Sequence, residues 1–505
     1  MPATRIVAGY KMAALLVMIG LWCSVGLAEE NRPNFVVFIA DDVSWNDYGC
    51  YGNRHARTPH IDQLASGGLR FTNAFLTASS CSPSRASMIT GRYPHNNGKA
   101  AELHLPIAPH LPWFPERLRD AGYYTGLVGK NHMKRAKADA GSEPPRKVFD
   151  LIDNGQLIDN HGAEGKWVEA VKNRPRDRPF FFWFAATDAH RDWDADREWK
   201  PEYGPMHQPN AVVLPPYLVD DLDTRKDLAS YYNEVTRFDY YIGQVVLALE
   251  EEGQLDNTVI LILADNGRPF PRAKTRLHDS GMKTALLVHW PRGITHRGET
   301  ASGLVSAIDI APTLLEVAGV PSPETFQGLS FLPILKNPSH QIRRYVFSEH
   351  NWHDYEAHGR AVRDQFGHLF IVNSRNQFAW QGPADSVRSP SHQSLLRQAG
   401  LASGITPAQN DVLMAPRPQF ELFDTLSDPW QIDNRSGQQT TREVESLLKE
   451  TLERWSEETL DSIPERVSAD SFDRQTGKRK NVKKYRFTTP GEDRGASRIN
   501  RSGPR

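Results

Sequence analysis

Four runs of apolar residues stand out along the chain, and polar residues follow each of them. The runs are NFVVFI (34–39), TGLVG (125–129), PFFFWFAA (179–186) and TVILILA (258–264), with TALLVHW (284–290) as a weaker fifth. Continuous apolar runs of this length are typical of strands that are buried on both faces, as in a parallel sheet. Apolar residues at helical spacing lie between them, for example over 225–253. Strands that alternate with helices predict an α/β fold with a large, mostly parallel sheet flanked by helices.

The pattern changes after about residue 344. Two strand-like runs, RYVFSEH (344–350) and HLFIVNS (368–374), precede a loop-rich stretch and an amphipathic helix over 441–460. This predicts a smaller C-terminal α+β subdomain over 345–469. The segment 470–505 is polar and basic, and we expect it to be a flexible tail. Its charge would suit an anionic polymer, but a solvated tail is the preferred interpretation.

The N-terminus has the three regions of a secretory signal peptide. Arg5 and Lys11 precede the apolar run MAALLVMIGLW, and the small-residue segment VGLAEE follows. We expect cleavage after Ala28, which leaves a catalytic domain over 29–344 and an exported protein in a periplasm, a lumen or the medium. The alternative is an uncleaved anchor, which the short apolar run disfavours. No membrane attachment is expected after cleavage.

Charge and cysteine content restrict the function further. The formal net charge is −1 and the isoelectric point is near 7.0, which gives no support to nucleic-acid binding. Only three cysteines occur, Cys23, Cys50 and Cys81, and the first belongs to the predicted signal. One disulfide between the other two is an open alternative, but a disulfide framework is excluded. Cys81 therefore invites another explanation.

Metal-capable and charged residues follow the predicted strands. Asp41 and Asp42 follow the first, Lys130 and His132 the second, His190 the third, and Asp265 with Asn266 the fourth. In open α/β sheets ligands bind at this carboxyl edge. Three carboxylates and an amide oxygen suit Ca²⁺ or Mg²⁺ rather than zinc. Singly, each of these residues has an ordinary interpretation as a helix cap or a turn residue. Together with the cations, which include Arg85 and Lys274, they predict a site for a substrate rich in anionic oxygen.

The segment CSPSRASMITGR, which begins at Cys81, resembles the signature of the formylglycine-dependent sulfatases. The resemblance continues through ADD near the start, GKNH, the histidine after PFFFWFAATDA, ADNG with a lysine eight residues beyond its asparagine, and ELFDTLSDPWQIDN. Within that family, SSCSPSRAS, DNGRPFPRAK and RWSEETLD are most similar to the sulfamidases that act on N-sulfoglucosamine. That branch has arginine where this chain has Lys274, and GMKTALLVHWPRG is closer to the O-sulfatases, so N-sulfate specificity is left open.

The resemblance implies a role for each matching residue. A sulfatase-maturing, formylglycine-generating enzyme would oxidise Cys81 to an aldehyde, and one Ca²⁺ would contact the modified residue. The other implied metal ligands are Asp41, Asp42, Asp265 and Asn266. The implied catalytic residues are Arg85 and Lys130, which would stabilise the hydrated aldehyde, His132, which would act on its second hydroxyl, and His190 with Lys274, which would hold sulfate and protonate the leaving group.

The aldehyde has a chemical reason. Its hydrate carries two hydroxyls on one carbon, so one can attack sulfur while the other, deprotonated by a base, collapses to the carbonyl and expels sulfate. Cys81 also stands at a predicted helix start, where backbone N–H groups point at anionic oxygen.

The expected substrate is a sulfated glycan of the glycosaminoglycan kind, with N-sulfoglucosamine as one candidate unit. His104, His350 and His353 are candidates for sugar binding, although a purely structural role suits each as well. Two other functions are open: a phosphomonoester or phosphonate hydrolase on the same scaffold, and an inactive glycan-binding homologue.

Overall fold

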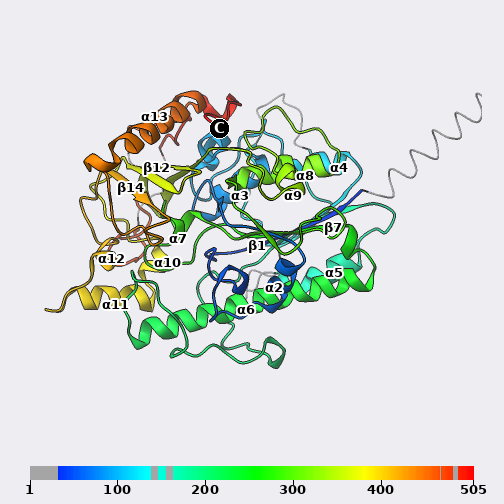
Figure 1. The fold of residues 1–505 in the computed structure, drawn as a ribbon, viewed down its shortest axis with the longest axis horizontal. Helices are drawn as coiled ribbons and strands as arrows, with labels where there is room; N and C mark the ends of the chain where they lie inside the picture. The colour runs from blue at the N-terminus through cyan, green and yellow to red at the C-terminus, as the bar shows by residue number, and fades with distance from the viewer. Residues whose placement is uncertain (1–31, 138–145, 155–162, 467, 482–486) are drawn as a thin grey trace, which may run out of the picture.

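The computed structural model describes residues 32–137, 146–154, 163–466, 468–481 and 487–505 (Figure 1). The predicted signal peptide, 1–28, lies outside these residues. The larger part of the molecule is built on an eight-stranded sheet with the order β5-β4-β6-β1-β7-β8-β2-β9. Its strands are β1 Asn34–Ala40, β2 Leu69–Phe71, β4 Tyr124–Gly129, β5 Leu151–Asp153, β6 Phe180–Ala185, β7 Thr258–Ala264, β8 Leu286–His289 and β9 Glu299–Ala301.

The centre of this sheet is parallel, as the apolar runs predict. β1 pairs with β6 on one side and β7 on the other, and β6 pairs with β4, all in parallel register. The fifth run also forms a strand, but β8 is antiparallel to both β7 and β2, contrary to its predicted place in a parallel sheet. A parallel β8 would need a crossover segment that carries the chain back to the amino-terminal end of β7. The connection between β7 and β8 is instead a loop with one short helix, α7 (Asp279–Met282).

Helices cover both faces of the sheet because alternate residues of β1 point to opposite sides. Val36 and Phe38 share a core with helices α2 (Pro59–Ser66), α5 (Trp167–Lys172) and α6 (Leu222–Glu251). Phe35, Val37 and Ile39 belong to the core on the other face. The helices there are α3 Cys81–Thr90, α4 Phe114–Asp120, α8 Ile310–Val317 and α9 Leu332–Lys336. No helix within the described ranges combines the length and apolar character that crossing a bilayer requires.

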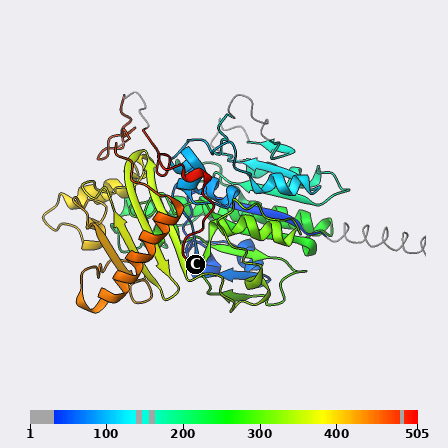
Figure 2. The ribbon, with the colours of Figure 1, turned by 90° about the horizontal axis from the view of Figure 1, so that it is seen from above.

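The C-terminal part is a separate α+β layer beside the large sheet (Figure 2). Its antiparallel strands are β11 Tyr345–His353, β12 Tyr355–Asp364, β13 His368–Asn373 and β14 Phe420–Asp424. Helix α13 (Arg442–Thr459) buries Leu448, Leu452 and Trp455 against this sheet. The short helices α10 (Ala384–Val387), α11 (Pro390–Ala399) and α12 (Pro407–Asn410) lie in the connection before β14. A two-stranded sheet of β3 (Ala74–Phe75) and β10 (Val305–Ser306) completes the described strands.

The end of the chain differs from the free tail that its composition predicts. Residues 487–505 fold back onto the catalytic part, where the buried guanidinium of Arg92 donates to the carbonyls of Ser497 and Ile499. Gln327 donates to the carbonyl of Arg501 at 2.8 Å. These bonds satisfy polar groups that would otherwise be buried without partners, so the segment is packed although it has little apolar surface.

Candidate active site

The four central strands bring the predicted residues to one edge of the sheet. Because β4, β6, β1 and β7 are adjacent and parallel, the segments that follow them meet at their carboxyl ends. Asp41, Asp42, Asp265 and Asn266 are all 0% exposed there. The sequence-predicted metal ligands are therefore brought together in one buried cluster.

Cys81 enters this cluster from the first turn of α3. Ser80 before it is extended, with φ of −158°, and the helix begins directly at Cys81. The Sγ atom lies 3.8 Å from Asp41 Oδ1 and 3.9 Å from Asp42 Oδ1. Burial raises the pKa of this thiol far above its ordinary value, although Lys130 and Lys274 act in the other direction. The unmodified side chain is therefore a protonated thiol and a poor nucleophile. Cys50 is also unpaired, so the alternative disulfide is not formed.

Three cations face the three carboxylates. Lys130 Nζ donates to Asp41 Oδ2, Lys274 Nζ lies 2.7 Å from Asp42 Oδ2, and Arg85 Nε lies 2.7 Å from Asp265 Oδ2. For Lys130, Lys274 and Arg85 alike, burial lowers the pKa, but the neighbouring carboxylates outweigh it and raise the pKa above its ordinary value. All three side chains are therefore charged at neutral pH.

The second oxygens of these carboxylates differ in their contacts. Asp42 Oδ1 accepts from Asn266 Nδ2 and Asp265 Oδ1 accepts from the backbone N–H of Asp42 at 3.3 Å, whereas Asp41 Oδ1 has only longer contacts, 3.8 Å to Cys81 Sγ and 4.0 Å to Arg85 Nη2. Among the described residues, the buried Asn266 Oδ1 has no hydrogen-bond partner. An all-oxygen donor set with an orphaned amide oxygen fits a hard divalent cation such as Ca²⁺. The residues present thus suit the metal that the sequence predicts.

The backbone is unusual at this edge. Asp42, His132 and His104 have φ of 63°, 48° and 68°, in the left-handed region that residues with a Cβ rarely adopt. Strained residues of this kind gather at functional sites, where surrounding structure holds them in place.

The predicted histidines occupy three different positions. His132 Nε2 lies 2.7 Å from His104 Nδ1, and burial together with Lys130 holds the pKa of His132 well below its ordinary value. His353 Nδ1 lies 2.7 Å from the hydroxyl of Ser80, next to Cys81. His350 is packed against Trp380, with ring centroids 5.4 Å apart, and burial lowers its pKa to about 3. His104 and His353 thus contact residues of the site or residues next to it, whereas the ring contact of His350 is with Trp380.

His190 and Lys274 share a neighbour that the sequence does not reveal. Asp385 Oδ2, from α10 of the C-terminal part, lies 3.7 Å from Lys274 Nζ and 3.9 Å from His190 Nε2. Nothing in the segment GPADSVRS distinguishes Asp385 from a helix-start residue, and only the packing of the C-terminal part on the large sheet brings it here.

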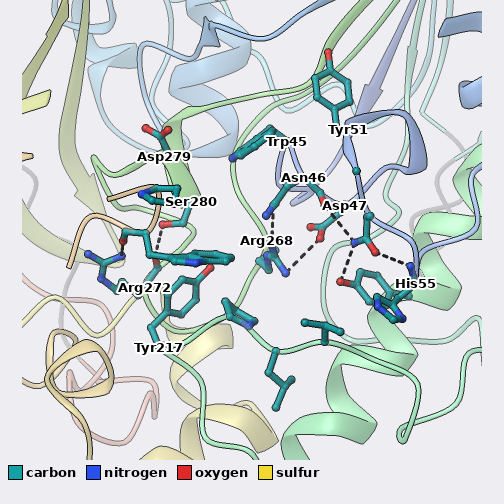
Figure 3. A pocket seen from close by; sticks show the side chains of 18 of the residues that line it. Trp45, Asn46, Asp47, Tyr51, His55, Tyr217, Arg268, Arg272, Asp279 and Ser280 are labelled. Atoms are coloured by element: carbon teal, nitrogen blue, oxygen red, sulfur yellow. Dashed lines mark hydrogen bonds and ion pairs between the residues drawn. The ribbon is translucent and has the colours of Figure 1, made fainter. Parts of the chain in front are cut away.

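A separate cavity of about 430 Å³ has none of the predicted site residues in its lining (Figure 3). Its lining includes Trp45, Tyr217, Arg268, Arg272 and Trp430. Arg268 is tied to Asp47 and Asn46, and Arg272 donates to the carbonyl of Trp430 at 2.8 Å. Both guanidinium groups are thus engaged in structural contacts.

Two family models match the chain. The model described as Sulfatase matches residues 33–320, and the model described as N-sulphoglucosamine sulphohydrolase, C-terminal, matches residues 272–372. The first covers more than half of the chain, so the chain belongs to the sulfatase family and is a sulfuric ester hydrolase by membership.

Individual relatives agree with this assignment. N-sulphoglucosamine sulphohydrolase of Homo sapiens is 30% identical over 86% of this chain and 92% of its own length. An ulvan-active sulfatase of Formosa agariphila is 29% identical over 84% of this chain and 74% of its own length. The fold is similar to that of a protein solved in complex with its substrate D-glucosamine-2-N,6-O-disulfate. That match has a TM-score of 0.64 and 20% identity, and covers 84% of this chain and 98% of the other. The predicted family and fold class are confirmed.

Proposed function

We propose that this protein removes sulfate from a glycosaminoglycan-like glycan, through a formylglycine made from Cys81 and with Ca²⁺ bound beside it. The observation that carries the proposal is the placement of Cys81 Sγ within 3.9 Å of carboxylate oxygens of both Asp41 and Asp42. A buried, protonated thiol has little use there as a nucleophile, whereas an oxygen on the same carbon would lie against a metal and several cations.

Asp41, Asp42, Asp265, Asn266 and residue 81 would hold the metal. Ca²⁺ supplies charge that stabilises anionic oxygen and lowers the pKa of a bound hydroxyl. Formylglycine supplies, when hydrated, two hydroxyls on one carbon.

The remaining roles follow from charge and position. Lys130 and Arg85 lie beside Asp41 and Asp265 and would hold the hydrate in place. His132 is neutral at neutral pH because its pKa is held low by burial and by Lys130, so its imidazole can accept a proton from the second hydroxyl. Lys274 and His190 would bind sulfate and stabilise the leaving group.

The proposed substrate is a sulfated glucosamine unit, linked through nitrogen or oxygen. This proposal is supported by the relative named for N-sulphoglucosamine and by the solved structure with a disulfated glucosamine. His104 and His353 border the cluster and would contact the sugar directly. His350, on the same strand as His353 and packed on Trp380, is the third proposed sugar-binding residue.

The proposal also covers export and maturation of the protein. A signal peptide over 1–28 would direct export to a periplasm, a lumen or the medium, and a maturing enzyme would oxidise Cys81. The mature protein would have no membrane attachment. Catalytic and C-terminal units over 29–344 and 345–469 would follow the signal, and the basic segment 470–505 would follow them.

Two other functions are distinguished by experiment. A phosphomonoester or phosphonate hydrolase would prefer phosphate esters, and an inactive glycan-binding homologue would bind without turnover. The charged cluster argues against the second, because Arg85, Lys130 and Lys274 are all in place.

The test is made on protein expressed in a host that contains a sulfatase-maturing enzyme. Mass spectrometry of the peptide containing residue 81 should show formylglycine, and rates on a matched aryl sulfate and aryl phosphate should favour sulfate. Unmodified cysteine in an active enzyme, or a preference for phosphate, would reject the proposal.

A further inference from the structure

Asp385 has one carboxylate oxygen that is fixed and one that is directed into the active site. Oδ1 accepts from the backbone N–H of Ser386 at 2.7 Å, and α10 is itself anchored by Asp354, whose Oδ2 accepts from the N–H of Ala384 at 3.0 Å. Oδ2 is left to face Lys274 and His190. The side chain is 18% exposed, so it is both rigidly placed and reachable by a substrate.

The two neighbours of Asp385 fix where a leaving group would lie. Lys274 Nζ is held 2.7 Å from Asp42 Oδ2, and His190 Nδ1 is engaged by the carbonyl of Arg191, which turns Nε2 toward Asp385. An atom hydrogen-bonded to both Lys274 and His190 would lie about 3 Å from each nitrogen. Because Asp385 Oδ2 is only 3.7 Å from Lys274 Nζ and 3.9 Å from His190 Nε2, an atom on the side of these nitrogens that faces Asp385 can also reach Oδ2.

The bridging atoms of a sulfate ester and of a sulfamate differ in the hydrogen bonds that they can form. The bridging oxygen of a sulfate ester carries lone pairs only, so it can interact with Lys274 and His190 but not with a carboxylate. The bridging nitrogen of a sulfamate carries a hydrogen, which needs an acceptor. Burial would raise the pKa of Asp385, but Lys274 and His190 hold it well below its ordinary value, so at neutral pH the group only accepts.

We propose that Asp385 accepts a hydrogen bond from the bridging N–H of a sulfamate and so selects N-sulfated over O-sulfated sugars. The proposal rests on the proposed sulfatase function and adds to it the linkage and the residue that reads it. An ester oxygen in the same place would bring lone pairs against a carboxylate. A site built to accept from a substrate N–H rejects the analogue that lacks it.

The experiment compares two sugars that differ only in the bridging atom, D-glucosamine N-sulfate and D-glucose 2-sulfate, with 4-methylumbelliferyl sulfate as a second O-linked reference. The kcat/KM of each is measured for the full-length matured enzyme and for Asp385→Asn and Asp385→Ala. Asn is isosteric and keeps an oxygen, whereas Ala removes the acceptor. Asp461→Asn is the matched control, because Asp461 forms a buried ion pair with Arg360 in the same C-terminal part, away from the site.

We expect wild type to prefer the N-sulfate, and the ratio of kcat/KM for N-sulfate to that for the O-linked substrates to fall about 10- to 100-fold in Asp385→Ala, and by less in Asp385→Asn. Asp461→Asn should lower the melting temperature and leave the ratio unchanged.

Two results would overturn the inference: a wild-type preference for O-linked substrates, or an unchanged ratio in both Asp385 variants, whether kcat/KM is itself unchanged or falls equally on all substrates. An equal fall would mean that Asp385 only orients Lys274 and His190. Each of these leaves a working sulfatase. Absence of turnover on every sulfate by the matured wild type would instead reject the proposed function.

Discussion

Two buried groups of charges lie at the carboxyl edge of the large sheet, and they are built differently. The first is the cluster of Asp41, Asp42 and Asp265 with three cations. The second surrounds Arg237, which contacts Asp188, Asp194 and Glu234 within 2.8 Å. Asp188 follows β6, so both groups begin at the ends of neighbouring strands.

The second group, called the closed group below, is one in which Arg237 and the backbone N–H groups around it satisfy the carboxylates. Both carboxylate oxygens of Asp188 are bound by Arg237, at 2.8 and 2.7 Å, and the second oxygen of Glu234 accepts from the N–H groups of Asp194 and Ala195. In the first group each carboxylate gives one oxygen to a close ion pair, while Oδ1 of Asp41 has only longer contacts, 3.8 Å to Cys81 Sγ and 4.0 Å to Arg85 Nη2. Buried charges that satisfy each other hold a structure together, whereas Asp41 Oδ1 with its long contacts and the unpartnered Asn266 Oδ1 suit a group that is not part of the chain.

The largest expected effect is on turnover. Cys81→Ala should lower the rate on an aryl sulfate by at least about 10³-fold, because it removes the proposed precursor of the nucleophile. Compared with the unmodified protein in the presence of a chelator, the melting temperature should change little, because the substitution removes one sulfur atom and no hydrogen bond shorter than 3.8 Å. Initial rates and thermal unfolding measure the two effects, and retained turnover would remove Cys81 from the mechanism.

The closed group should respond in the opposite way. Arg237→Met leaves three carboxylates buried without their common partner and should cost about 3–5 kcal/mol of stability. The expected readout is a loss of melting temperature or of folded yield. Any folded fraction should keep the calcium dependence of wild type, and a stable variant with altered calcium dependence would erase the contrast between the two groups.

Metal removal tests the proposed metal ligands directly. A chelator should lower both activity and melting temperature, and added Ca²⁺ should restore them in a saturable way. Asp265→Asn should raise the calcium concentration needed for half-maximal restoration about 10- to 100-fold. Calorimetric titration provides a measure that does not depend on turnover. Restoration of Asp265→Asn at the wild-type concentration would contradict the assignment of this ligand.

The smallest expected effect concerns Glu164, which borders the closed group and accepts from the N–H of Thr187 at 2.7 Å. Burial and the neighbouring Asp188 raise the pKa of Glu164 to about 8. A raised carboxyl pKa stabilises the fold at low pH, and this stability is lost as pH rises from the ordinary carboxyl range through about 8. Glu164→Gln mimics the protonated form, so its melting temperature relative to wild type should increase by roughly 2–4 °C between pH 5 and pH 9. A constant difference would show that Glu164 is ionised throughout.

Much of the fold and of the site could be predicted because the relevant signals are local. Buried parallel strands are continuous apolar runs, and the residues directly after them must gather at one edge. That reasoning brings Asp41, Asp42, Asp265 and Lys130 together without any knowledge of the rest of the chain.

The features that escaped prediction depend on contacts between distant segments. Asp385 lies in a polar loop that the C-terminal part delivers to Lys274. The direction of β8 depends on the path of the loop before it. The packing of residues 487–505 depends on hydrogen bonds to backbone carbonyl groups. Because every residue has such a group, the pattern of side chains could not predict it.

The buried position of Cys81 and the packing of segment 487–505 bear on when the proposed modification of residue 81 could take place. Arg92 donates to the carbonyls of Ser497 and Ile499. It directly follows Gly91, the C-cap of α3, and α3 is the helix that begins at Cys81. Segments so far along the chain leave the ribosome long after Cys81 has emerged, and Cys81 is only 2% exposed in the folded protein. The proposed maturing enzyme would therefore have to act on residue 81 before the structure around it has folded.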